Sequence, residues 1–69
     1  MPIYFAQILL EYKIVEIYGD LNIRTYLASL GLKEGSLIQV LKKYSGHIIV
    51  NLNGNNIILT KSIAKYVLI

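Results

Sequence analysis

Few side chains in this sequence could do catalytic chemistry. The chain of 69 residues has a single histidine, His47, four acidic residues and no cysteine. Glu11 and Glu16 fall in or beside the first predicted strand, whereas Asp20 and Glu34 fall in predicted turns. No spacing pairs these carboxylates with one another or with the histidine as a general acid and base. The sequence therefore predicts no catalytic residues and a protein that is not an enzyme.

Metal binding is not expected either. Iron(II) and zinc sites need several imidazole, thiolate or carboxylate ligands that converge on one point. His47 lies beside a predicted turn, and no acidic residue lies between Glu34 and the last residue. The sequence therefore predicts no metal ligands and no cofactor.

Lys42, Lys43 and Tyr44 form a basic and aromatic run that would suit nucleic acid. Small β-barrels bind single strands through a basic groove with aromatic stacking platforms. The chain has six tyrosines but a net charge of only +3, which is low for a dedicated nucleic-acid binder. Tyr12, Tyr18 and Tyr44 would suit a proline-rich peptide if they converged. Nucleic acid is therefore not the expected partner but stays the main alternative.

The composition favours a small cytoplasmic protein. Hydrophobic residues make up 55% of the sequence and the mean hydropathy is +0.54. No apolar run reaches the roughly 20 residues that a membrane span needs. The absence of cysteine, and a first segment without a basic region or cleavage site, argue against secretion. We expect one domain over residues 1–69, without direct membrane insertion and with some apolar surface left for a partner.

One helix is predicted, from Asn22 to Leu30. Asn22 is placed to accept hydrogen bonds from the first turn. Gly31 stands where a left-handed residue would end the helix. The predicted apolar stripe consists of Ile23, Tyr26, Leu27 and Leu30. Because so short a helix is marginal alone, we expect it to pack against a sheet.

Five short strands are predicted around this helix. The first runs from Tyr12 to Tyr18, with a bulge near Val15. In the second, Ile38, Val40 and Lys42 alternate along one face. The remaining strands lie at 48–52, 56–60 and 66–69, and the turns are at Gly35, Ser45-Gly46, Asn53-Gly54 and a helical turn capped by Ser62. The apolar segment 3–10 has no clear period, so an edge strand and a lid both stay open.

Strands this short suggest a small barrel, because closing the sheet hides its edges. The helix would plug one end of that barrel. The terminal strand from Tyr66 to Ile69 would carry an unpaired edge, which makes a homo-oligomer a second option for association.

The order of these elements resembles the FeoA family of ferrous iron transport proteins. It also resembles the SH3-like domain at the C-terminus of iron-dependent repressors. The likeness covers about Ile14 to Ile69 and rests on the run Leu30-Gly31-Leu32 with Gly35 and an alternating strand after it, and on Gly54, Leu59, Ala64 and Val67. The chain departs from the family pattern at Leu10, Thr25, the short loop 44–47 and Thr60.

The resemblance implies a mainly β, small SH3-like barrel of about five strands with one short α-helix. It also implies a cytoplasmic adaptor that binds a FeoB-type membrane GTPase, the permease that imports Fe²⁺. The predicted partner contacts are Arg24, Lys42, Lys43, Tyr44 and His47. The predicted structural residues are Asn22, Leu30, Gly31, Leu32, Gly35, Gly54, Leu59 and Ala64.

Overall fold

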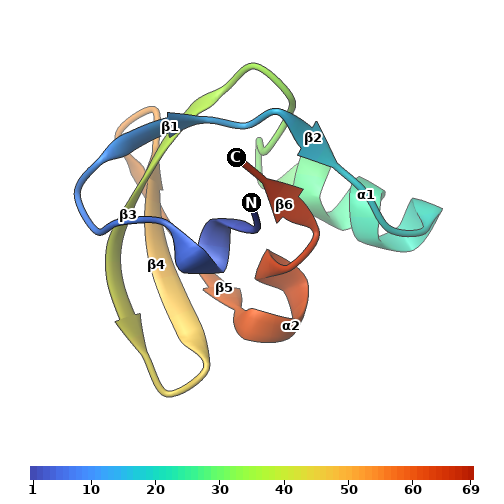
Figure 1. Cartoon of the computed structure of the whole chain (residues 1–69). Coiled ribbons are helices and arrows are strands. Elements are labelled where there is room, and N and C mark those ends of the chain that lie inside the picture. The colour runs from blue at the N-terminus through green and yellow to red at the C-terminus, as the bar shows by residue number, and fades with distance from the viewer.

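Short strands account for most of the regular structure in the computed structural model, which describes residues 1–69 (Figure 1). In chain order the elements are a 3-10 helix η1 (Ile3–Phe5), β1 (Glu11–Lys13), β2 (Glu16–Ile17), α1 (Leu21–Ser29), β3 (Leu37–Tyr44), β4 (His47–Leu52), β5 (Asn55–Thr60), α2 (Lys61–Ala64) and β6 (Val67–Leu68). The mainly β architecture predicted from the sequence is thereby confirmed.

The strands form two sheets and not one closed barrel. Strands β1, β3, β4 and β5 pair in that order in an antiparallel sheet, and β2 pairs with β6 in a second one. The outer strands β1 and β5 are therefore edges of the larger sheet. Closure by backbone hydrogen bonds, which the sequence suggested, does not occur.

The chain changes sheets between Ile14 and Val15. The Ile14 N–H donates to the Ser36 carbonyl at 2.9 Å, beside β3, whereas the Val15 N–H donates to the Leu68 carbonyl at 2.8 Å, in β6. The stretch predicted as one bulged strand is therefore two short strands, β1 and β2. Ile14 is buried in the core, whereas the side chain of Val15 is exposed.

A single apolar core lies between the sheets and the short helices. Every buried residue in the chain is hydrophobic, so no buried polar group needs a partner. The core consists of Ile3, Ala6, Ile14, Leu27, Leu32, Ile38, Val40, Ile48, Val50, Leu52, Leu59, Ala64 and Val67. Burying a side chain of this size contributes about 1.5–3 kcal/mol, so this cluster is the main stabilising feature of the fold.

Helix α1 begins one residue after Asp20, and Asp20 is its N-cap. The Asp20 carboxylate accepts a hydrogen bond from the Ile23 N–H at 2.9 Å. Asn22 lies exposed within the first turn, so the predicted Asn22 cap is wrong. Asp20 takes the role because the chain leaves β2 through Gly19 and is already extended at Asp20, as a cap residue must be.

We expect Asp20→Ala to lower the free energy of unfolding by about 1 kcal/mol, because the first turn then loses its side-chain acceptor. Asn22→Ala is the matched control and should change stability by less than about 0.5 kcal/mol. Urea unfolding followed by circular dichroism measures both. A larger loss of stability in Asn22→Ala than in Asp20→Ala would show that Asn22 is the N-cap.

The run Leu30-Gly31-Leu32 ends α1 in a Schellman motif. Gly31 has a φ of +88°, and its N–H donates to the Ala28 carbonyl at 2.9 Å. The Leu32 N–H donates to the Leu27 carbonyl at 3.1 Å. Leu27 and Leu32 are both buried, which supplies the apolar contact typical of this motif. Leu30 itself is only half-buried against the core.

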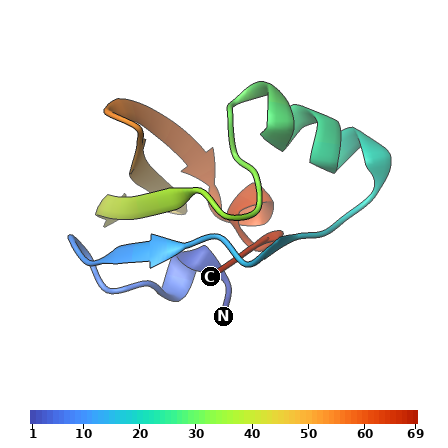
Figure 2. The same ribbon diagram turned by 90° about the horizontal axis from the view of Figure 1, so that it is seen from above.

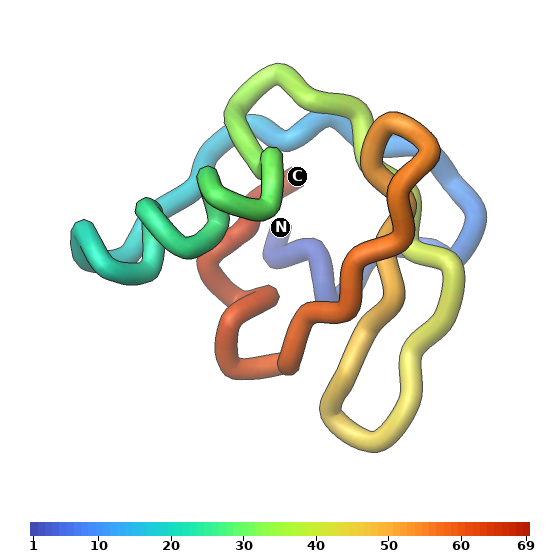
Figure 3. The backbone as a smooth tube through the Cα atoms, turned by 180° about the vertical axis from the view of Figure 1, so that it is seen from behind, coloured from blue at the N-terminus to red at the C-terminus, as the bar shows by residue number.

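Helix α1 extends away from the sheets instead of plugging them (Figures 2 and 3). Leu27 is its only buried residue, and Ile23 is half-buried. Tyr26, predicted to lie on the apolar stripe, is exposed, as is Leu21 in the first turn. Because the helix packs through a narrow line of contact, only part of the predicted stripe is covered.

The tight turns follow the sequence closely. Asn53 and Gly54 have φ of +54° and +84°, as a two-residue type I′ hairpin requires, and they connect β4 to β5. Gly35 has a φ of +88° in the turn before β3. Each of these glycines therefore stands where the backbone is left-handed.

The chain ends differ from the sequence expectation. Segment 3–10 is not an edge strand, because it consists of η1 followed by an irregular loop. Ser62 does not cap α2, whose N-cap residue is Thr60. Strand β6 pairs with β2 on one side and meets Pro2 on the other, and the Met1 ammonium donates to the Ile69 carbonyl at 3.1 Å (Figure 1). The terminal strand therefore has no free edge for self-association.

Candidate partner-binding surface

A β-bulge in β3 decides which lysine faces outward. Val40 pairs with Val50, but the next paired residue, Lys42, lies opposite Ile49, so Leu41 is an extra residue. An extra residue reverses the alternation of side chains beyond it. Lys42 therefore lies on the outer face of the sheet, exposed, instead of on the face of Ile38 and Val40 as predicted.

The outer face of the β3–β4 hairpin brings three of the predicted contact residues together. The Tyr44 and His47 rings stack with centroids 5.7 Å apart and planes at 19°. The Lys42 ammonium lies 5.6 Å from the Tyr44 ring centroid, within the range of a cation–π contact. We call Lys42, Tyr44 and His47 the hairpin patch.

A hydrogen bond to the hairpin turn orients His47. Its Nδ1 lies 3.0 Å from the Ser45 carbonyl oxygen. Because a carbonyl only accepts, this contact places the hydrogen on Nδ1 and leaves Nε2 available to a partner. The hairpin patch thus offers an ammonium group, a phenol and an imidazole nitrogen side by side.

The other two predicted contact residues lie elsewhere. Lys43 pairs with the buried Ile48 and so lies on the opposite side of the sheet from Lys42. Its ammonium lies 5.7 Å from the Tyr4 ring. Arg24 is exposed on α1, away from the hairpin. The five residues therefore do not form one surface.

Two further properties of the structure bear on the sequence expectations. No three or more histidine, aspartate or glutamate side chains gather in a way that could hold a metal ion. No helix has both the length and the apolar character to cross a bilayer.

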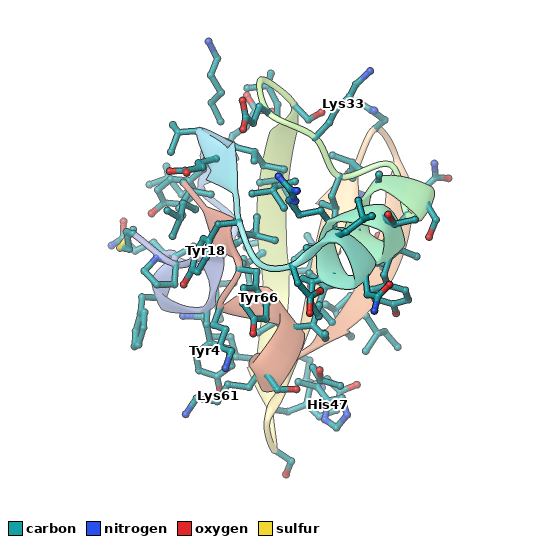
Figure 4. All side chains as sticks on the ribbon, turned by 90° about the vertical axis from the view of Figure 1, so that its right-hand side faces the viewer. Tyr4, Tyr18, Lys33, His47, Lys61 and Tyr66 are labelled. Carbon is teal, nitrogen blue, oxygen red and sulfur yellow. The ribbon has the colours of Figure 1, made fainter.

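Sequence reasoning missed a second cluster at the N-terminus. Lys61, at the start of α2, places its ammonium 5.1 Å from the Tyr4 ring, on which Lys43 also converges. Tyr4 and Phe5 meet edge to face at 6.0 Å. Figure 4 shows Tyr4 beside Lys61, with Lys33 at the opposite end of the molecule. The sequence feature that could have drawn attention to this region is the apolar segment 3–10, whose pattern has the period of neither a helix nor a strand.

The fold defines a class of protein: a small, mainly β, SH3-like domain. A comparison with family models makes the assignment specific. The FeoA domain model matches residues 1–69, so the chain belongs to the FeoA family. The family links the chain to iron uptake.

Solved structures agree with this assignment. An iron uptake regulatory protein (FeoA) has a TM-score of 0.89 and 31% identity, over 97% of this chain and 91% of that one. A FeoA-like protein from Clostridium acetobutylicum has a TM-score of 0.85 and 23% identity, over 97% and 80% of the two chains. A manganese-dependent transcriptional repressor shares the fold at a TM-score of 0.87 and 20% identity, over 97% of this chain and 39% of that one. No curated protein sequence matches significantly.

Proposed function

We propose that this protein is a cytoplasmic adaptor of ferrous iron uptake that acts by binding a FeoB-type membrane GTPase, the Fe²⁺ permease. Membership of the FeoA family supports the pathway. The observation that carries the binding role is the hairpin patch, where Lys42, Tyr44 and His47 meet on a solvent-facing sheet. The adaptor itself is not catalytic.

The chemistry of the hairpin patch fits a protein partner. Tyrosine supplies a large rigid contact area at low cost in conformational entropy, and such residues often dominate binding energy. The Lys42 ammonium would donate hydrogen bonds to carboxylates or carbonyl oxygens of the partner. The free Nε2 of His47 would accept a hydrogen bond from an N–H or O–H group of the partner. An adaptor of this kind changes the permease only by binding one of its conformations more tightly than another.

The test uses two exposed tyrosines as a matched pair. Tyr44 in the hairpin patch is 41% exposed and Tyr26 on α1 is 49% exposed. We expect Tyr44→Ala to weaken binding to the solubilised permease by about thirtyfold, which corresponds to about 2 kcal/mol, if Tyr44 is a central contact. Tyr26→Ala should leave the affinity within about twofold. Biolayer interferometry measures both dissociation constants.

Two outcomes would contradict the proposal. Equal affinities for the Tyr44 variant and the parent chain would remove the hairpin patch from the interface. Binding to random-sequence DNA that falls steeply with salt would instead favour the nucleic-acid alternative, because phosphate contacts release counterions. Far-UV circular dichroism of each variant shows that the fold is intact.

A further inference from the structure

Four large apolar side chains are exposed at the end of η1 and in the loop that follows it. Among Ile8, Leu9 and Leu10, the side chain of Leu9 is the most exposed, at 64%. We call Phe5, Ile8, Leu9 and Leu10 the apolar loop. Together with Ala6, Gln7 and Lys43 these residues line a shallow hollow on the surface.

The apolar loop is held in place and not merely loose. The Leu9 N–H donates to the Val40 carbonyl at 2.8 Å, and the Gln39 side-chain amide donates to the Leu9 carbonyl at 2.6 Å. The Gln7 N–H donates to the Tyr12 hydroxyl at 3.0 Å. Leu9 has a φ of +69°, a conformation that costs a leucine roughly 1–2 kcal/mol. A strained backbone that keeps leucine side chains in solvent points to a function for the loop.

Positive charge lies next to the apolar loop. Lys43 lines the same hollow, and Lys43 and Lys61 both place their ammonium groups on the Tyr4 ring, which contacts Phe5. Glu11 follows Leu10 in the sequence but lines a separate hollow on the outer face of the sheet. The partner of this region must therefore combine an apolar phase with negative charge.

We propose that the apolar loop and the Lys43–Lys61 pair bind the surface of an anionic lipid bilayer. Ile8, Leu9 and Leu10 are consecutive and all exposed. The acyl region of a bilayer surface can cover apolar side chains whatever their direction, as it does for interfacial anchors. Lysine stems lie along apolar surface while their ammonium groups reach the lipid headgroups. The contact is interfacial and needs no spanning helix.

Flotation of the full chain with lipid vesicles tests this proposal. The chain should float with vesicles that contain phosphatidylglycerol and bind much less to vesicles of phosphatidylcholine alone. Lys61→Gln should weaken binding about fivefold, because a lysine near an anionic surface contributes about that factor. Lys33→Gln removes the same charge at the opposite end of the molecule. It should change the free energy of vesicle binding by less than half as much as Lys61→Gln does.

Substitutions of leucine separate membrane binding from folding. Leu9→Asp should reduce binding more than tenfold, whereas Leu21→Asp, at a 70% exposed leucine on α1, should leave it unchanged. Leu9→Gly should also reduce binding, yet its melting temperature should equal or exceed that of the parent chain, because glycine relieves the positive φ.

Three results would overturn the proposal. The first is that the chain does not float with anionic vesicles. The second is that Leu9→Asp and Leu21→Asp bind these vesicles equally well. The chain could also bind a soluble acidic and apolar peptide but not vesicles, which would make the apolar loop a peptide site. No permease is present in these assays, so their outcome is independent of the proposed function.

Discussion

Replacing Leu27 with alanine is expected to lower the free energy of unfolding by about 2–5 kcal/mol. Leu27 is the only buried side chain of α1 and lies fully within the core. A cavity at this position therefore weakens the core and the attachment of the helix together, and a nine-residue helix is marginal without that attachment.

Leu21→Ala is the control for this prediction. Leu21 belongs to the same helix but is 70% exposed, so its loss should change stability by less than about 0.5 kcal/mol. Urea unfolding followed at a helix-sensitive wavelength measures both variants, and the slope with denaturant should stay constant. Similar losses of stability in Leu27→Ala and Leu21→Ala would show that α1 packs through a different face.

Gly19→Ala is the second change with a large expected effect, a loss of about 2–5 kcal/mol in the free energy of unfolding. Gly19 has a φ of +114°, which strains any residue with a Cβ. A Cβ there would lie 3.0 Å from Ile23 Cγ2 and 3.0 Å from Tyr66 Cδ1. Strain of about 1–2 kcal/mol therefore adds to the overpacking of a core-facing site, about 1–3 kcal/mol.

Gly54→Ala separates the two contributions. Gly54 has a φ of +84°, but no atom lies within 4 Å of a Cβ built there, so only the strain of about 1–2 kcal/mol applies. Thermal unfolding should therefore place the melting temperature of the Gly19 variant below that of the Gly54 variant. The reverse order would mean that Ile23 and Tyr66 can move aside freely.

Sequence reasoning succeeded where a feature depends on neighbours along the chain. The Asn53-Gly54 hairpin needs only positive φ at adjacent residues, and the end of α1 needs only a left-handed Gly31 between two leucines. Both are readable from residue types. The Leu30-Gly31-Leu32 run with Gly35 after it, together with the later Gly54, Leu59, Ala64 and Val67, indicated the FeoA family, which the family model confirms.

Sequence reasoning failed where a feature depends on a partner far along the chain. The break between β1 and β2 exists because Val15 finds its acceptor in Leu68, and the outward position of Lys42 exists because β3 carries an extra residue opposite Val50 and Ile49. The irregular alternation near Val15 indicated a bulge but not the change of sheet, and the extra residue in β3 leaves no local sign in the sequence. The exposure of Tyr26 likewise depends on how α1 lies on the sheets.

The candidate surfaces divide in the same way. Lys42, Tyr44 and His47 lie on one hairpin, so their sequence proximity determined that they would meet once the register was set. Only the tertiary structure brings Lys43, Tyr4 and Lys61 together, because they come from β3, η1 and α2, three elements well separated in the sequence. The sequence alone determined the Asn53-Gly54 hairpin turn and the helix end, since these need only local backbone conformation. It also indicated the family, since the family pattern consists of residue types at given spacings. The strand pairing decided which side chains reach solvent, because one extra residue in a strand reverses every side chain beyond it.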